Sequence, residues 1–600
     1  MLDRIIDWSL AHRLVVLFAA GLVLIAGGWA AATLPIDVFP DLTAPTVTVL
    51  TEAHGMAAEE VELLVTFPIE TAVNGASGVR RVRSSSAQGI SIVWVEFDWG
   101  TDIFRARQIV SEKLQLLSGG LPAGVDPPIL APITSIMGEI LLVGMTSDQH
   151  SPMVVRSAAD WTVRRRLLAI AGVAQVIPIG GQVKQYQVRV DPDALLLHGL
   201  SLGDVLRAAE GSNENASGGV YQESGREVLI RGIGRARSVD DIASTVVAVR
   251  DGAPVLLGQV AEVEIGPAPR FGAGSVNAEP AVVLSILKQP NANTLTLTER
   301  IDRELEEIQA QLPEGIEINR GIFRQATFIS LAVANVVEAL RDGAILVIVV
   351  LFLFLWNLRT TGISVLAIPL SLAAAVLVMK LLGVTINTMT LGGMAIAIGA
   401  LVDDAIIDVE NVFRRLRENL QRSEHRRLPP LQVVSVASKE VRGPILNATI
   451  VITLVFVPLF FLSGVEGRML RPLGFAYIVS IGASLLVAVT VTPTLCSYLL
   501  PRARFLQREK ESWLVERLKR VYSWALGLTL SHGGLVVAGS ALIVAGTLAS
   551  FPLVGRGFLP EFQEGTLVIS AVTVPGTGLD TSDEIGRRVE RLLLEHPAVV

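Results

Sequence analysis

The chain has 600 residues, of which 51% are apolar and 18% are charged. This composition is too apolar for an ordinary soluble enzyme and too polar for a chain that lies wholly within a membrane. The net charge of -7 gives no basic surface for nucleic acid, and the single cysteine, Cys496, excludes intrachain disulfides and cysteine-pair metal sites.

Seven apolar stretches are long enough to cross a membrane, since about 20 helical residues span the hydrocarbon core. They lie at residues 13–33, 337–356, 362–382, 389–412, 444–463, 474–500 and 533–553. The first stretch follows Arg4 and Arg13, so a cleaved signal peptide is the competing interpretation. We favour a membrane span, because the stretch is long for a signal peptide and has a counterpart at 533–553.

Basic residues predict the orientation of these spans. They gather after the fourth span (Arg414, Arg415, Arg417, Arg422, Arg426, Arg427, Lys439, Arg442) and after the sixth (Arg502, Arg504, Arg508, Lys510, Arg517, Lys519, Arg520). Lysine and arginine concentrate in cytoplasmic loops, so both loops and the N-terminus are predicted to be cytoplasmic. The large loop after the first span and the segment after Phe551 then lie on the opposite side, which in a bacterium is the periplasm.

Short strands and amphipathic helices alternate in the large loop. Strands are predicted at 46–51, 79–84 and 90–97, with helices at 57–72 and 102–117. This order indicates a split βαβ, ferredoxin-like unit. A second such unit is predicted from Ile140 through a helix at 157–169 and a strand at 173–177, and it resumes with a strand at 282–287 and a helix at 295–311.

A polar insert separates the pieces of the second unit. The run Asn213 to Gly219 contains serine, asparagine and glycine, which are typical of turns. We interpret the insert as a separate small module and this run as a protein-docking turn.

The junction after the first span is repeated after the last one. Phe39-Pro40-Asp41 is matched by Leu559-Pro560-Glu561, an offset of 520 residues, and in each copy a strand (46–49 and 567–570) and then a helix (57–72 and 581–594) follow. This order predicts an internal duplication, of which the chain holds the first copy and the start of the second.

Four acidic residues lie near the end of the fourth span, namely Asp403, Asp404, Asp408 and Glu410. A charged side chain at mid-bilayer costs about 2.5 to 3.5 kcal/mol even on the mildest scale, so we expect these residues to have a function. On a helix, Asp403 and Glu410 share one face, and Asp404 and Asp408 share an adjacent face. Two neighbouring carboxylates cannot both be comfortably ionised in a low dielectric without a cation nearby. Asp403 and Asp404 are therefore the predicted proton site.

Asp408 and Glu410 are further candidates for the proton site. The competing interpretation is that they pair with Arg414 and Arg415 at the cytoplasmic interface. Gly392 and Gly399 fall on the Asp403 face, where small residues let another helix approach closely. The remaining charged residues of the spans, Glu338, Asp342 and Lys380, are interpreted as interfacial.

No metal site or cofactor is predicted from spacing. The seven histidines have no i, i+4 pairing and the nine methionines form no cluster, so each is interpreted as structural or as a surface residue. The histidines are His12, His54, His150, His198, His425, His532 and His596. Whether the chain binds metal is left open.

Three motifs resemble the resistance-nodulation-division (RND) efflux permeases. The run Gly-Ala-Leu-Val-Asp-Asp-Ala-Ile-Ile-Asp-Val-Glu-Asn-Val at 399–412 is similar to their fourth-helix signature. The run Leu34 to Asp41 and the Gly464-x-Glu466-Gly467 turn are similar to the same family. The extra acid Asp408 and the basic continuation at 413–417 are closer to the heavy-metal efflux branch than to the multidrug branch.

The resemblance implies an α-helical polytopic membrane protein with large periplasmic α+β domains, and a secondary active transporter rather than an enzyme. The implied parts are the N-terminus and first span (1–33), a first porter subdomain (34–134), a second porter subdomain (135–177 with 276–325), a docking insert (178–275), spans two to six (326–500), a cytoplasmic linker (501–532), a seventh span (533–553) and the start of a second periplasmic domain (554–600).

The resemblance also implies a homotrimer in the bacterial inner membrane, driven by proton influx, with a periplasmic adaptor and an outer-membrane channel as partners. Asp403 and Asp404 match the paired proton-relay acids of the family. The lysine that pairs with them belongs to the tenth helix, beyond residue 600.

The implied substrate is a heavy-metal cation. Relatives that export copper or silver use periplasmic methionines, and 566–574 contains none, which argues against soft monovalent metals. The first alternative is an RND pump for amphiphilic organic compounds. An intramembrane aspartyl protease is a remote alternative, because it needs aspartates on two helices and a Gly-x-Gly-Asp pattern. A non-transporting assembly or lipid-handling relative would be expected to lack the paired acids.

Overall fold

The computed structural model describes most of the chain, in two compact units. The described residues are 2–34, 36–37, 40, 42, 44–117, 120–134, 138–250, 252–290, 292–501, 513–555, 566–574, 576–597 and 599. The first unit contains 1–138, 289–297 and 325–567, and the second contains 139–288, 298–324 and 568–600. Parts of three predicted motifs lie outside the described residues: Pro35, Val38, Phe39 and Asp41, the basic residues at 502–510, and the repeat at 559–561.

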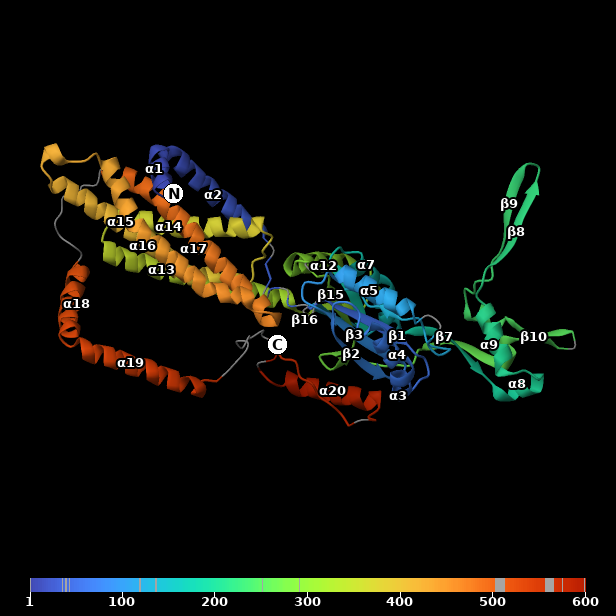
Figure 1. The fold of residues 1–600 in the computed structure, drawn as a ribbon. Helices are drawn as coiled ribbons and strands as arrows, with labels where there is room; N and C mark the ends of the chain where they lie inside the picture. The colour runs from blue at the N-terminus through green and yellow to red at the C-terminus, as the bar shows by residue number, and fades with distance from the viewer. Residues whose placement is uncertain are drawn as a thin grey trace. The chain divides into compact units, whose positions relative to one another are not determined.

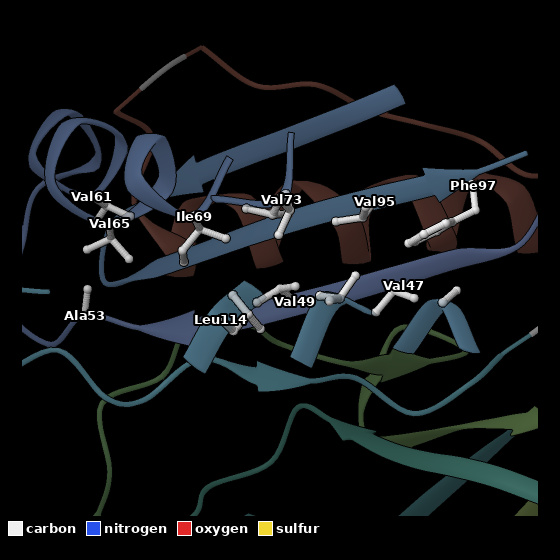
Figure 2. Packing of buried hydrophobic residues seen from close by; sticks show 13 residues of the cluster. Val47, Val49, Ala53, Val61, Val65, Ile69, Val73, Val95, Phe97 and Leu114 are labelled. Carbon is white, nitrogen blue, oxygen red and sulfur yellow. The ribbon is translucent and has the colours of Figure 1, made fainter. Parts of the chain in front are cut away.

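The first unit contains a four-stranded antiparallel sheet. Its strands are β1 (Thr46–Glu52), β2 (Val79–Ala87), β3 (Ile90–Phe97) and β4 (Ile129–Leu130), in the order β2-β3-β1-β4. Alternate residues of β1 and β3 point into the core, so that Val49 is opposite Val93 and Val47 is opposite Val95. Val47, Val49 and Val95 are labelled in Figure 2. This period of two is the pattern expected for a sheet with one buried face.

Two helical segments pack with this sheet and complete the first split βαβ unit. The first consists of α3 (Ala58–Val61), a π-helical turn (Glu62–Thr66) and α4 (Phe67–Val73), and the second is α5 (Ile103–Gln115). Val61, Val65, Ile69 and Val73 recur at helical spacing and are fully buried in the same core (Figure 2). Asp102 caps α5 by accepting the Arg105 backbone N–H at 2.9 Å.

The second unit contains a sheet of the same topology. Its strands β5 (Glu139–Ser147), β6 (Val173–Ile179), β15 (Val282–Lys288) and β16 (Ile316–Arg324) lie in the order β16-β5-β15-β6. This order corresponds to β4-β1-β3-β2, so both predicted split βαβ units are confirmed. The helical segments are α6 (Pro152–Ala158), a π-helical turn (Ala159–Val163), α7 (Arg164–Leu168) and α12 (Thr294–Gln309).

A module is inserted between β6 and β15. Its elements are β7 (Lys184–Val190), α8 (Pro192–His198), α9 (Leu202–Gly211), β8 (Ala216–Glu223), β9 (Arg226–Gly232), α10 (Val239–Ala243), β10 (Val246–Arg250), β11 (Ala253–Leu256), α11 (Leu257–Val260) and β12 (Ala261–Pro267). The turn predicted at 213–219 is partly wrong, because β8 already begins at Ala216. Strands β8 and β9 form a hairpin whose residues are all exposed (Figure 1).

Six helices of the described chain are long and apolar enough to span a membrane. They are Arg13–Thr33 (α2), Leu358–Leu381 (α14), Thr388–Gln421 (α15), Pro430–Phe461 (α16, Pro430–Phe456, and the 3-10 turn after it), Gly464–Leu499 (α17) and Gly533–Leu553 (α19, Gly533–Ser550, and the 3-10 turn after it). The predicted span at 337–356 is not among these six. It lies in α13 (Gln325–Leu355), where Glu338, Arg341 and Asp342 confine the uncharged stretch to 343–355. A further helix, α18 (Trp513–Ser531), precedes α19.

A short amphipathic helix, α1 (Leu2–Ala11), precedes the first span and is docked on the helical bundle. Ile6 and Leu10 are buried in a cluster with Val434 and Ala437 of α16. Asp7 forms an ion pair of 2.5 Å with Lys439, and Asp3 pairs with Arg442. The N-terminal segment is therefore held by both apolar and charged contacts.

The predicted second copy is confirmed only in part. The helix predicted at 581–594 is α20 (Leu579–Leu594). The strand predicted at 567–570 is wrong for the structure as described, since these residues pair with no described strand and Leu567 and Val568 are 92% and 94% exposed. Apolar alternation favours a strand only where a neighbouring strand supplies hydrogen-bond partners.

Candidate functional site

Helix α15 carries all four predicted acids. Asn387 caps its first turn, accepting the Thr390 backbone N–H at 2.9 Å, while the Thr390 hydroxyl accepts the Asn387 N–H at 2.8 Å. Its 34 residues give a length of about 51 Å at 1.5 Å per residue, which exceeds the hydrocarbon core of about 30 Å. The basic end of the helix can therefore extend beyond the membrane.

The acids of α15 lie on two faces with different surroundings. Asp403 and Glu410 are exposed, Asp404 is half-buried, and Asp408 is only 2% exposed. This distribution follows the two faces expected for a helix, with one face directed away from the described residues and the other packed. The neighbouring acids Asp403 and Asp404 thus have different environments.

The packed face of α15 contacts α14, α16 and α17. The Ser484 hydroxyl of α17 donates to the Leu401 carbonyl of α15 at 3.1 Å. Within the described chain a close helix approach occurs at Gly393, where a Cβ would overlap the Leu473 carbonyl. A Cβ at Gly392 or Gly399 meets no described atom within 4 Å, so the packing role predicted for these two glycines stays a prediction. The face predicted for packing is thus the more open one in the described chain.

Asp408 is enclosed beside Ser438 of α16, and no hydrogen bond of normal geometry joins the two side chains. Both of its carboxylate oxygens are buried and unpartnered among the described residues, and so is the hydroxyl of Ser438 on α16. The adjacent Val409 belongs to an apolar cluster with Val434 of α16 and Cys496 of α17. Removing an ion from water costs several kcal/mol when no partner compensates, so a charge on Asp408 is coupled to the packing of these helices.

The basic residues after the acids have other partners than those expected. Arg415 pairs with Glu440 at 2.5 Å and with Glu418 at 2.9 Å, and Arg414 donates to the Asn411 side chain at 2.7 Å. The predicted alternative of Asp408 and Glu410 pairing with these arginines is therefore not observed in the described chain.

Asn411 was missed by reasoning that searched for ionisable groups. Its side-chain amide is buried and donates to the Ala437 carbonyl at 2.8 Å. This hydrogen bond joins α15 to α16 one helical turn after Asp408. The available sequence signal was an asparagine three residues after Asp408, within the same apolar span.

Lys380, the charged residue at the end of α14, is placed away from the acids. Its ammonium group donates to the Thr33 hydroxyl of α2 and lies 3.4 Å from the centre of the Trp29 ring. This anchoring is consistent with its interpretation as an interfacial residue. Within the described residues, no ion pair joins Asp403, Asp404 or Asp408 to a base.

The chain matches a known family and several known proteins. Residues 5–600 match the sequence profile described as the AcrB/AcrD/AcrF family. Protein HelA of Legionella pneumophila is 35% identical over 100% of the chain and 57% of its own length. The cobalt-zinc-cadmium resistance protein CzcA of Cupriavidus metallidurans is 32% identical over 99% and 56%, and the cation efflux system protein CusA of Escherichia coli is 34% identical over 100% and 58%.

A solved structure agrees with these matches. The crystal structure of a heavy metal efflux pump superposes with a TM-score of 0.83 and 26% identity, covering 99% of this chain and 57% of that one. The chain thus spans less than two thirds of the relatives it matches, and the resemblance extends over all of its own length. The chain belongs to the AcrB/AcrD/AcrF family of RND permeases.

Proposed function

We propose that the chain is part of a proton-driven antiporter that exports heavy-metal cations. The observation that carries the proposal is the helix α15, on which Asp403 is exposed and Asp404 is half-buried within an apolar bundle. Such a pair can receive a proton on the open side and transmit the change of charge to the packed side. Asp403 and Asp404 are the proposed proton relay, with Asp408 and Glu410 as further members.

The exposed face of α15 is evidence for a basic partner outside the described chain. Asp403, Glu410 and Gly399 all lie on this face and are exposed. A helix that brings a lysine to this face would compensate the charge of Asp403, and protonation would release the contact. One charge moved through 100 mV supplies about 2.3 kcal/mol, so one or two protons can support a substantial gradient.

Metal cations are the proposed substrates. The relatives named above include a cation efflux protein and a cobalt-zinc-cadmium resistance protein, and 566–574 has no thioether for a soft monovalent ion. Export of amphiphilic organic compounds is the alternative. Proteolysis is disfavoured, since the mid-span aspartates lie on one helix.

The proposed arrangement places the sheet-containing parts in the periplasm of a bacterium and the helical bundle in its inner membrane. We propose 34–134 and 135–177 with 276–325 as the porter subdomains and 178–275 as the docking insert. The exposed apolar residues Tyr221 and Leu229 of the β8–β9 hairpin support a role of this insert in assembly as a homotrimer with an adaptor and an outer-membrane channel.

Substitution of the relay acids tests the proposal. Asp403→Asn and Asp404→Asn in the intact transporter are expected to abolish resistance to zinc, cobalt and cadmium in a strain that lacks other pumps, with normal protein levels in the membrane. Glu418→Gln on the same helix is the matched control, because Glu418 pairs with Arg415 beyond the acids. Full metal resistance in either aspartate variant would refute the relay. If the wild-type transporter confers resistance to dyes and detergents and not to metals, the alternative substrate class is favoured.

A further inference from the structure

Three chemically complementary side chains meet on the surface of the first unit. The His54 Nε2 lies 3.5 Å from the Glu52 Oε2 and 3.5 Å from the Asp126 Oδ2. One ligand atom from each residue lies within 4.8 Å of the others. All three side chains are exposed, and thus open to ions in solution.

The backbone holds these residues in register. Glu52 is the last residue of β1, and His54 stands in the turn that follows Ala53. Ala53 is fully buried, donates its N–H to the Gly89 carbonyl at 2.8 Å and pairs with Val125 in an antiparallel bridge. The Asp126 N–H donates to the Glu52 carbonyl at 2.9 Å, which aligns Asp126 beside Glu52.

The two distances from His54 are those of metal ligands, and the two carboxylate oxygens lie within 4.8 Å of each other. Zn²⁺ binds histidine nitrogen and carboxylate oxygen at about 2.0 to 2.2 Å, so two ligands at a tetrahedral angle are about 3.4 Å apart. The observed 3.5 Å agrees with this distance. It is longer than a charge-assisted hydrogen bond of about 2.7 to 2.9 Å. Small side-chain rotations can therefore close the three groups around an ion.

Other histidines of the described chain have different partners. The His150 ring bonds to the Glu314 carbonyl at 2.9 Å, and the His12 ring bonds to the Trp8 carbonyl at 3.1 Å. Sequence spacing did not identify His54, because one of its two carboxylate neighbours lies far along the chain at Asp126.

We propose that Glu52, His54 and Asp126 form a binding site for a divalent cation of borderline softness, with Zn²⁺ as the representative ion. The site supplies one imidazole nitrogen and two carboxylate oxygens and leaves a fourth position for water, a donor set that suits Zn²⁺. The proposal goes beyond transport, since binding here requires neither a proton gradient nor the acids of α15.

Calorimetric titration of the purified full chain in detergent with Zn²⁺ tests the site. The wild-type chain is expected to bind one more equivalent than His54→Ala, and His425→Ala is the matched control, since His425 is also exposed but outside the cluster. Glu52→Gln is expected to lower the affinity for this additional Zn²⁺ ion. Thermal unfolding without metal checks that all variants are folded.

Cobalt provides a second measurement, because Co²⁺ in a tetrahedral site gives a strong visible absorption that an unbound ion lacks. This absorption is expected in wild type and in His425→Ala and lost in His54→Ala. Equal zinc stoichiometry and affinity in wild type and His54→Ala would overturn the proposal. Because no gradient is applied, a failure here is distinguishable from a failure of metal export.

Discussion

Asp404 and Asp408 lie one helical turn apart on the packed side of α15, and burial increases sharply between them. Asp404 is half-buried, while Asp408 is 2% exposed and both its oxygens lack a hydrogen-bond partner in the part of the chain that the structure describes. Burying a carboxyl group without a hydrogen-bond partner lowers the stability of the folded state. If Asp408 belongs to the proposed proton relay, its replacement is expected to raise stability and to lower transport.

Asp408→Val is expected to stabilise the folded chain by about 1 to 3 kcal/mol, because a valine fills a similar volume without an uncompensated polar group. Thermal unfolding in detergent measures the effect. If Asp408 takes part in proton transfer, the same variant is more stable but exports less metal. A lower unfolding temperature for Asp408→Val would contradict the assignment of Asp408 as unpartnered.

The sequence predicted the elements of the fold better than their packing. Alternation along β1 and β3 and the helical period of α5 predicted both split βαβ units, since these patterns report which face is buried. The helix faces of α15 were also predictable, but the direction in which each face points depends on distant helices. The contact that Gly393 makes with Leu473 could therefore not be predicted from the sequence, while the role of Gly392 and Gly399 stays a prediction.

The contact of α15 with α17 gives a sharp test of packing. A Cβ at Gly393 would overlap the Leu473 carbonyl, which is backbone and cannot rotate away. Gly393→Ala is therefore expected to destabilise the chain by about 1 to 3 kcal/mol, as overpacking does. The midpoint of thermal unfolding in detergent gives the measurement.

Gly482→Ala is the matched control, since the same substitution at this exposed position inside α17 meets no described atom within 4 Å. It is expected to be neutral or stabilising by up to about 1 kcal/mol, because alanine favours a helix over glycine. Equal unfolding temperatures of the two variants would be incompatible with the observed packing.

The docking of α1 is expected to depend on pH. A hydrogen bond from Lys439 lowers the pKa of Asp7 below its usual value of 3.8. A carboxylate with a lowered pKa stabilises the folded state above its unfolded pKa, and this contribution is lost as the pH falls through the folded value. Hydrogen exchange of the α1 amides, corrected for intrinsic rates, should thus accelerate below about pH 3.8.

Asp7→Asn removes the titrating group and is expected to expose α1 to exchange already at neutral pH, with a flatter pH profile. The effect is modest, because Asp7 is more than half exposed and water screens the ion pair. An unchanged profile in Asp7→Asn would mean that the Asp3–Arg442 ion pair and the apolar contacts of Ile6 and Leu10 hold the helix without Asp7.

Glu590 attaches α20 to a tight hairpin of the second unit. Its carboxylate accepts the Ser275 hydroxyl at 2.5 Å and the Ala278 N–H at 2.6 Å. Asn277 and Ala278 have φ angles of +54° and +66°, a conformation that costs energy for residues with a Cβ. The acid therefore supports both the helix and the strained turn between β13 (Ser275–Val276) and β14 (Glu279–Pro280).

Glu590→Ala is expected to loosen both elements, because a charge-assisted hydrogen bond contributes about 1.5 to 3 kcal/mol and two are lost together. Faster hydrogen exchange in α20 and at Ala278 measures this change. Glu595→Ala is the control, since Glu595 follows the end of α20 and is exposed. If the α20 amides exchange at the same rate in Glu590→Ala and Glu595→Ala, the attachment of α20 depends on its other contacts. Among them is the Arg270–Asp580 ion pair of 2.5 Å.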